Sequence, residues 1–285
     1  MNKLVLYARL VKFEHTIFAM PFALIGFFMA TMVTDQVSFW KLLAEVVLCM
    51  VFARNSAMGF NRYLDRRFDA ANPRTAQREI PAGQISAPKA LTFVIINALL
   101  FCFVTWLINP LCFSLSPVAL FVILGYSYTK RITPLCHFVL SLGLSLAPIG
   151  AWLAVTGYFA LTPLLFSGIV FFWVSGFDII YACQDVEFDH HYRLQSIPVL
   201  VGIKNALRIS TFVHGLTLVF VILAGISLEA NSIYWGGATI FATLMVYQHA
   251  IVKPNDLSRV NLAFGTTNGI AGVIYALFVI ISLYF

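Results

Sequence analysis

Two short stretches of the sequence carry oxygen-bearing side chains at the spacing of one helical face. In the first, Asn61, Asp65 and Asp69 lie four residues apart, so a helix would turn all three to nearly the same side. Such a group of oxygen ligands is typical of a site for a hard divalent cation. The second stretch follows the same face at intervals of three, four and four residues: Asp178, Tyr181, Asp185 and Asp189. Six of the 12 acidic residues fall in these two stretches, and this concentration predicts a functional site.

Two carboxylate clusters with cations nearby indicate a site for a diphosphate bridged by magnesium. Mg²⁺ is typically held by one or two carboxylates together with phosphate oxygens of a substrate. Two such ions would neutralise a leaving diphosphate. The remaining charge would fall to nearby cations, with arginine as a bidentate fork and lysine as a point charge: Arg74, Arg78, Lys130 and Arg131. Other basic residues are interpreted as topology signals: Arg62, Arg66, Arg67 and Lys253.

Arg54 is a charged residue inside a segment that is otherwise typical of a membrane-spanning helix. It lies seven residues before Asn61 and therefore shares a helical stripe with Asn61 and Asp65. A charge at membrane depth is costly, and such a residue is usually functional. Two roles are open: an ion pair with Glu45, or binding of an anionic acceptor group such as a carboxylate from within a cavity. The spacing of nine residues places Glu45 poorly, so we favour the acceptor role.

The elements that must position these residues are transmembrane helices. The chain is 60% hydrophobic and only 11% charged, whereas charged residues make up about a quarter of an average soluble protein. Apolar runs of about 20 residues mark bilayer-spanning helices. We predict an all-α fold of nine such helices around a central cavity, at residues 15–34, 38–60, 88–108, 111–128, 134–156, 161–183, 204–227, 231–251 and 260–284.

The positions of the basic residues predict which side of the membrane each link faces. Of the 18 Lys and Arg residues, all but Lys41 and Arg54 fall before the first predicted helix, in every second link or in the first turns of the helix that follows such a link. Since Lys and Arg accumulate in cytoplasmic loops, this pattern predicts a cytoplasmic N-terminus and places both acidic stretches on the cytoplasmic side. The net charge of +6 expresses this topology, and no nucleic-acid partner is expected.

No linker divides the sequence, so we predict a single domain over residues 1–285. Asp65 and Asp185 are 120 residues apart, as are Asp69 and Asp189, which favours an internal duplication of four-helix units at roughly 38–156 and 161–284. The five cysteines show no CxxC spacing and are expected to be small buried side chains rather than disulfides or metal ligands.

The paired stretches resemble the two signatures of the UbiA superfamily of intramembrane aromatic prenyltransferases. The first resemblance extends from Asn61 through Asp69 to the segment 72–83, which reads Asn-Pro-Arg-Thr-Ala-Gln-Arg-Glu-Ile-Pro-Ala-Gly. The second covers 178–189, and Tyr126 to Arg131 is similar to the Tyr-x-x-x-Lys-Arg segment of the family. One departure is Arg62, because enzymes acting on 4-hydroxybenzoate usually carry Asp there. In this detail the chain is similar to relatives on the futalosine route to menaquinone.

The resemblance implies transfer of a polyprenyl group from its diphosphate to an aromatic hydroxy acid, either 4-hydroxybenzoate or a dihydroxynaphthoate, in ubiquinone or menaquinone biosynthesis. It implies catalysis by Asp65, Asp69, Asp185 and Asp189, with Mg²⁺ held by these four and by Asn61 and Asp178. The implied acceptor contacts are Arg54, Asn61, Tyr126 and Tyr181. The expected location is the bacterial inner membrane, with the bilayer and the two substrates as partners and no protein partner.

Two other functions remain open at this point. A haem O synthase or chlorophyll synthase type of the same superfamily would use a macrocyclic acceptor. A secondary transporter, from a different class, would share the repeats and the intramembrane charges. A transporter would concentrate its charges near the bilayer midplane, whereas here most of them flank predicted helix ends.

Overall fold

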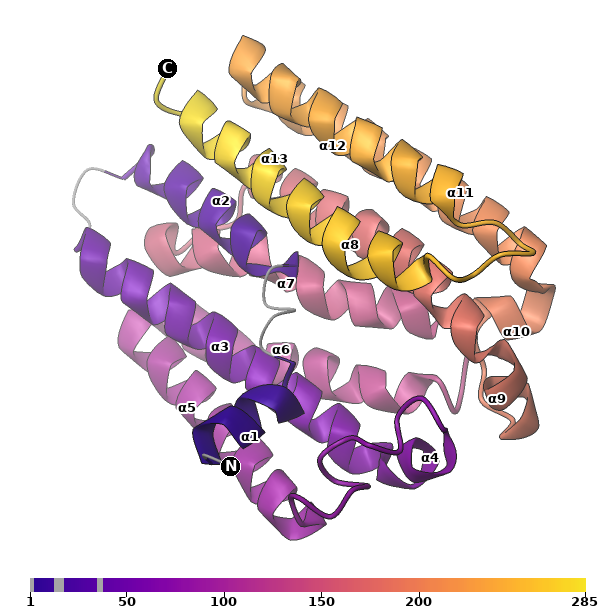
Figure 1. The fold of residues 1–285 in the computed structure, drawn as a ribbon. Helices are drawn as coiled ribbons and strands as arrows, with labels where there is room; N and C mark the ends of the chain where they lie inside the picture. Colours follow the sequence, from indigo (N-terminus) through magenta and orange to yellow (C-terminus); the bar gives the residue numbers. More distant parts are fainter. Residues whose placement is uncertain (1–2, 13–17, 35–37) are drawn as a thin grey trace.

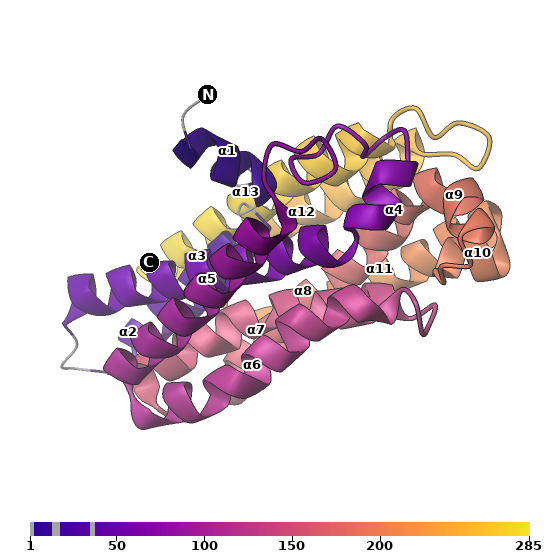
Figure 2. The same cartoon turned by 90° about the horizontal axis from the view of Figure 1, so that it is seen from below.

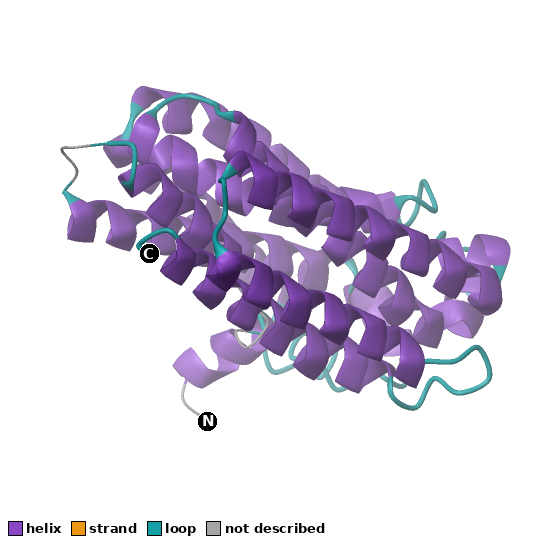
Figure 3. Cartoon of the chain, turned by 90° about the horizontal axis from the view of Figure 1, so that it is seen from above, coloured by secondary structure: helices purple, strands orange, loops and turns teal. Residues whose placement is uncertain are grey.

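The described chain is almost entirely helical (Figure 3). The computed structural model describes residues 3–12, 18–34 and 38–285, and within these ranges no strand forms. The helices are α1 (Lys3–Leu10), α2 (Met20–Thr31), α3 (Phe39–Leu64), α4 (Arg66–Ala71), α5 (Ala87–Ile108), α6 (Pro110–Thr129), α7 (Cys136–Thr156), α8 (Leu161–Ala182), η2 (Cys183–Asp185), α9 (Val186–His191), α10 (Ile197–Val201), α11 (Ile203–Ser227), α12 (Ser232–Ile251), the π-helix η3 (Leu262–Thr267) and α13 (Asn268–Ser282).

Local sequence signals set several of the helix ends. Pro88 and Pro110 stand in the first turns of α5 and α6, where a missing backbone N–H costs nothing. Asn109 caps α6 by accepting a hydrogen bond of 2.8 Å from the backbone N–H of Cys112. Gly157 ends α7 at φ +72°, a left-handed conformation that glycine adopts without steric cost.

Seven described segments are long and apolar enough to cross a membrane. They are α3, α5, α6, α7, Leu161–His191, α11 and Leu262–Ser282. Two predicted spans are not among these seven. One of them, 231–251, forms the helix α12. The remaining one appears as the 12-residue helix α2, and its predicted first residues, 15–17, lie outside the described residues. The all-helical membrane fold is confirmed, whereas the count of nine spans stays a prediction.

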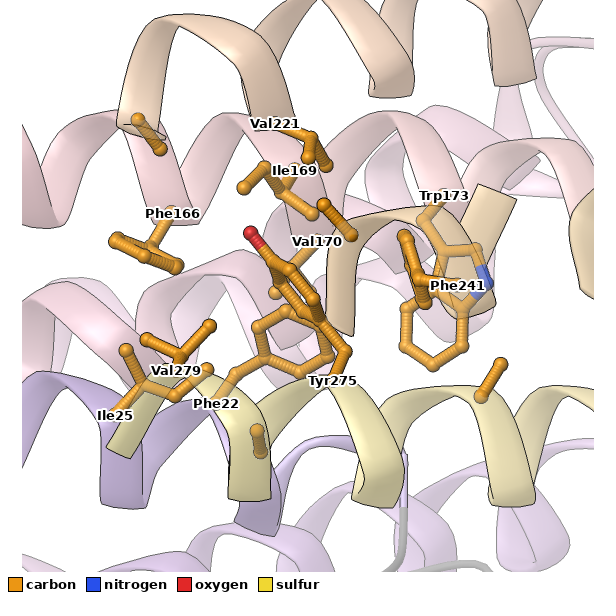
Figure 4. Packing of buried hydrophobic residues seen from close by; sticks show 14 of the residues in the cluster. Phe22, Ile25, Phe166, Ile169, Val170, Trp173, Val221, Phe241, Tyr275 and Val279 are labelled. Atoms are coloured by element: carbon orange, nitrogen blue, oxygen red, sulfur yellow. The ribbon is translucent and has the colours of Figure 1, made fainter. Parts of the chain in front are cut away.

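Helix α8 lies at the centre of the largest hydrophobic core. Phe166, Ile169 and Trp173 project from α8 toward Phe22 of α2 and Tyr275 of α13, and all five side chains are fully buried (Figure 4). On another face α8 lies so close to α11 that a Cβ atom on Gly176 would come within 2.2 Å of the His214 ring. Small residues allow this close approach, which dispersion forces favour between helices in lipid.

The links that carry the charged motifs gather at one end of the bundle. Figures 1 and 2 both place α4, α9 and the links 72–86, 130–135 and 252–261 there, away from the C-terminus. Helix α1 packs at the start of α5, with Leu10 against Ala90 and with Tyr7 stacked on Phe93 at 4.9 Å between ring centroids. The structure therefore brings the basic links together at one end, as the topology predicts. That this end is cytoplasmic stays a prediction.

Candidate active site

The first predicted stripe is interrupted at Asp65, where α3 ends and α4 begins. The Asn61 side-chain amide donates to Asp65 Oδ2 over 3.1 Å, and Arg131 Nη2 lies 2.6 Å from Asp65 Oδ1. Burial raises the pKa of the Asp65 carboxyl, although the Arg131 charge acts in the opposite direction. Asn61 and Asp65 therefore stay in contact, and Asp65 is paired with Arg131, one of the residues predicted to bind the diphosphate.

Asp69 forms a separate pair beyond this break. Its Oδ1 atom lies 2.7 Å from Arg78 Nη1, and its side chain is only 8% exposed. The second carboxylate oxygen, Oδ2, is buried without a hydrogen-bond partner among the described residues. The loop after α4 folds over this carboxylate, since the Thr75 hydroxyl donates to the Asp69 carbonyl oxygen over 3.1 Å.

Asp185 and Tyr181 of the second stripe both bind Arg74 from the first loop. Arg74 donates from Nε and Nη2 to the two oxygens of Asp185 over 3.1 and 2.6 Å, which is the bidentate geometry that arginine favours. Its Nη1 donates to the Tyr181 hydroxyl over 2.8 Å. Arg74 and Asp185, which are 111 positions apart in sequence, thus connect the two predicted motifs.

Asp189 is fully buried and pairs with Lys130 at 2.8 Å. Burial lowers the pKa of the Lys130 ammonium, and the Asp189 carboxylate more than reverses this effect, so the pKa lies above its ordinary value. The Lys130 carbonyl also accepts from the backbone N–H of Gln195 over 2.7 Å, which ties the end of α6 to the link after α9.

Asp178 has a partner that the sequence did not indicate. His137 Nδ1, near the start of α7, lies 2.7 Å from Asp178 Oδ2, and the His137 side chain is buried. The other ring nitrogen of His137 accepts from the backbone N–H of Ile197 over 3.4 Å. Asp178 is therefore fixed by a histidine at the head of the neighbouring helix rather than by one of the predicted cations.

The paired carboxylates and cations, with His137 and Tyr181, line one cavity of about 630 Å³. Its polar end contains every predicted site residue: Arg54, Asn61, Asp65, Asp69, Arg74, Arg78, Tyr126, Lys130, Arg131, Asp178, Tyr181, Asp185 and Asp189. Its apolar part continues along the inner faces of the helices, where Met50, Leu115 and Phe177 are among the lining side chains. The structure therefore brings the two motifs to one space that also has room for an apolar group.

The predicted metal ligands line this cavity, but they do not form a preformed coordination site among the described residues. Among the described residues, no group of three or more His, Cys, Asp or Glu side chains is close enough together to hold an ion. The donor chemistry nevertheless fits magnesium, because the oxygens are hard ligands and the buried Oδ2 atoms of Asp69 and Asp189 accept no hydrogen bond within the described chain. Phosphate oxygens of a substrate would complete the coordination.

Arg54 lines the cavity and also donates to the backbone. Its Nη2 donates to the carbonyl oxygens of Lys12 and Val11 over 3.1 and 3.4 Å. The alternative pair with Glu45 does not form, since Glu45 lies 3.7 Å from Lys41 instead. Tyr126, the other predicted acceptor contact besides Asn61 and Tyr181, is held on α6 and faces the same cavity.

The placement of Arg62 in the loop after the second predicted helix is wrong, whereas its interpretation as a topology signal stays a prediction. Helix α3 continues to Leu64, past the predicted end at residue 60, so Arg62 lies inside the helix and is only 3% exposed. It lines the cavity, and its Nη1 has no hydrogen-bond partner among the described residues. Burial followed from the longer helix and the overlying loop, neither of which the local sequence showed.

The fold and the cavity define a polytopic membrane protein with an intramembrane site that ends in paired carboxylates and cations. A profile of the UbiA prenyltransferase family matches residues 19–280. The chain belongs to this family, and the predicted resemblance is confirmed.

Individual relatives agree with this assignment. The 4-hydroxybenzoate octaprenyltransferase of Aliivibrio fischeri (strain MJ11) is 29% identical over 245 residues, which cover 85% of this chain and 84% of the relative. A UbiA homologue from Aeropyrum pernix K1 has a TM-score of 0.84 at 28% identity, covering 95% of this chain and 98% of that one. A UbiA homologue from Archaeoglobus fulgidus bound to GPP and Mg²⁺ shares the fold, with a TM-score of 0.72 at 21% identity over 98% and 100% of the two chains.

Proposed function

We propose that this enzyme transfers a polyprenyl group from its diphosphate to an aromatic hydroxy acid in quinone biosynthesis. The observation that carries the proposal is a single cavity that both carboxylate motifs and the four predicted diphosphate ligands line, together with many apolar side chains. A prenyl diphosphate likewise combines a charged head with an apolar tail. The names of the relatives point to the same chemistry: a 4-hydroxybenzoate octaprenyltransferase and a homologue bound to GPP and Mg²⁺.

The chain's own residues would bind and orient the diphosphate. Arg74, Arg78, Lys130 and Arg131 would take its oxygens, and Asp65, Asp69, Asp185 and Asp189, with Asn61 and Asp178, would hold magnesium. Magnesium, when bound, would neutralise the charge that develops on the leaving diphosphate. His137 would keep Asp178 oriented through their 2.7 Å contact. The buried walls of the cavity would exclude water from the allylic carbon.

The bond changes follow from this arrangement. The C–O bond between the prenyl group and diphosphate breaks, and diphosphate leaves with the electron pair. The allylic carbon then forms a C–C bond with the ring carbon beside a phenolic hydroxyl, and the ring loses the proton from that carbon. Aromatic side chains in the cavity, Tyr181 among them, would stabilise the allylic cation through their π faces.

The acceptor is 4-hydroxybenzoate or a dihydroxynaphthoate, and Arg54 would bind its carboxylate, with Asn61, Tyr126 and Tyr181 around the ring. The proposed location is the bacterial inner membrane, where a polyprenyl substrate is itself dissolved. The four ion pairs join residues in the links and short helices that follow α3, α6 and α8, and these elements lie at one end of the bundle. This position supports an enzyme over a transporter, which would place its charges nearer the bilayer midplane.

The test is a product assay with purified protein in detergent or lipid discs. Geranyl diphosphate is supplied with each acid in turn, with Mg²⁺ or with EDTA, and products are identified by mass spectrometry. We expect one acid to be prenylated only when Mg²⁺ is present. Asp65→Ala and Asp185→Ala should each abolish the product, whereas Asp256→Ala, in an exposed link outside the cavity, should retain it. Failure of the folded wild type to prenylate either acid would reject the proposal.

A further inference from the structure

The four predicted catalytic carboxylates and the four predicted diphosphate ligands are paired one to one. Arg131 binds Asp65 at 2.6 Å, Arg78 binds Asp69 at 2.7 Å, Arg74 binds Asp185 at 2.6 Å and Lys130 binds Asp189 at 2.8 Å. Each pair therefore joins a proposed ligand of the metal to a proposed ligand of the diphosphate.

These pairs cancel each other's charge inside a largely apolar cavity. A metal ion that enters alone meets four carboxylates already neutralised by cations, and a diphosphate that enters alone meets four cations already held by carboxylates. Arg62 lines the same cavity and belongs to none of these four pairs. Either ligand must break strong charge-assisted contacts before it binds. When both enter, the released carboxylates bind the metal and the released cations bind the phosphate oxygens, so no charge is left buried without a partner.

The Arg74–Asp185 pair is one of the two pairs most accessible to exchange, together with Arg131–Asp65. Its side chains are 34% and 12% exposed, and it joins the loop after α4 to the end of α8. Since it is bidentate, it holds both carboxylate oxygens that a metal would need. The buried oxygens that accept no hydrogen bond, Asp69 Oδ2 and Asp189 Oδ2, are free to receive a ligand once the neighbouring cations turn away.

We propose that magnesium and diphosphate bind by exchange of these ion pairs, so that each ligand increases the affinity for the other. The inference rests on the proposed function for the identity of the two ligands, and it adds that neither binds tightly alone. The same reasoning assigns a double role to each cation: Arg74 opposes metal binding in the absence of diphosphate and binds diphosphate in its presence. By linkage, the factor by which magnesium tightens diphosphate binding equals the factor in the reverse direction.

Opposite effects of removing the two partners of one pair test this proposal. Calorimetric titration of purified protein with Mg²⁺ alone should give an affinity that Arg74→Gln increases, by about fivefold or more, the lower end of typical coupling factors. Titration with inorganic pyrophosphate in EDTA should give an affinity that Asp185→Asn increases by a similar factor. Pyrophosphate binding to Arg74→Gln should be weaker than to the wild type.

Matched controls separate pair exchange from a general change of charge. Arg67→Gln removes a cation from the exposed side of α4, and Asp256→Asn removes a carboxylate from an exposed link. Neither residue lines the cavity or belongs to the four pairs. Both should leave the affinities near those of the wild type. Circular dichroism and thermal unfolding confirm that each variant is folded.

Two results would overturn the proposal. One is tight Mg²⁺ binding to the wild type without pyrophosphate, at the same affinity as with it. The other is a Mg²⁺ affinity of Arg74→Gln equal to that of Arg67→Gln together with unchanged pyrophosphate binding by Asp185→Asn. These titrations need no turnover, so they can fail while the product assay succeeds, and the product assay can fail while exchange is observed.

Discussion

The Arg54 guanidinium is shared between the backbone and the cavity. Its Nη2 donates to the carbonyl oxygens that follow α1, and the same side chain lines the space proposed for the acceptor. A planar fork with five donors reaches two partners in different directions, whereas the three donors of an ammonium leave from one atom. The proposed role would connect the position of the N-terminal helix to the binding of the acceptor.

Replacement of Arg54 should act on the acceptor and spare the prenyl diphosphate. Loss of a charge-assisted contact costs on the order of 1.5–3 kcal/mol, so Arg54→Ala should lower kcat/KM for the acceptor by roughly tenfold to more than a hundredfold. Arg54→Lys should recover only part of this loss. Steady-state kinetics with each substrate varied in turn provide the measurement.

Two other results would assign Arg54 differently. An increase confined to the KM of the prenyl diphosphate would move Arg54 to the leaving-group site. Poor accumulation in the membrane, with normal kinetics of the protein that remains, would make the bonds to Val11 and Lys12 its main role.

At the residue scale, regular spacing in the sequence predicted residues of the site, whereas contacts between different helices could not be predicted. The four-residue intervals identified the carboxylates that line the cavity, because helical periodicity is a local property. His137 escaped notice because it meets Asp178 only through the packing of α7 on α8. The sequence predicted a loop at Arg62 and gave no local signal for its burial inside the last turn of α3, where it is 3% exposed.

At the scale of elements, a buried polar network connects α8, α11, α12, the π-helix η3 and the first residue of α13. Asn268 is its junction: its Oδ1 accepts from Trp173 Nε1 over 3.1 Å, and its Nδ2 donates to Gln248 Oε1 over 3.0 Å and to the Ala263 carbonyl over 2.8 Å. His214 continues the network to His249 at 2.7 Å. Helix η3 in turn holds Phe264 against Tyr181, with 4.2 Å between ring centroids, at the cavity wall.

Asn268→Ala should destabilise the protein, because it leaves the buried donor of Trp173 and the buried acceptor of Gln248 without this partner. Each buried polar group left unsatisfied costs about 1–3 kcal/mol, although measured interhelical bonds in membranes average about 0.6 kcal/mol. We expect a loss of about 1–3 kcal/mol in unfolding free energy, measured by denaturant titration in detergent.

Asn205→Ala is the matched control for this network. Asn205 lies on the exposed side of α11, where its amide donates to the carbonyl oxygen of Val201 over 3.1 Å and accepts from Arg208 Nη1 over 3.4 Å. An exposed substitution of this kind changes stability by about 0.5 kcal/mol or less. Equal stability of the two variants would show that the network contributes little to the fold.

Helix positions were predicted well, and their ends less well. Apolar runs located the long helices because burial in lipid requires about 20 apolar residues in a row. The extension of α3 to Leu64 was missed, since its last turn contains the charged Arg62 and resembles a loop in composition. The π-helix also lacked a local signal, because Asn268 stabilises it through partners on other helices.

At the scale of the whole molecule, the arrangement of the links decides which compartment supplies the soluble substrate. The links rich in Lys and Arg meet at the end of the bundle that carries α4 and α9 (Figures 1 and 2). A polar aromatic acid and magnesium would enter at this end, while the prenyl tail is supplied by the bilayer. Sequence predicts this sidedness through the distribution of positive charge alone.

Accessibility of single cysteines to a membrane-impermeant thiol reagent tests the sidedness. In a background in which the five native cysteines are replaced by Ala or Ser, Asn255→Cys and Arg74→Cys should be labelled only after the cytoplasmic face is exposed. Thr156→Cys and Glu229→Cys, in links at helix ends that carry no Lys or Arg, should be labelled in intact cells. Glu229 and Asn255 are the clearest pair, because both are exposed and they lie at opposite ends of α12. Labelling of Asn255→Cys in intact cells, with Glu229→Cys protected, would show that the orientation in the membrane is the reverse of the predicted one. The proposed active site would then lie at the outer face of the membrane.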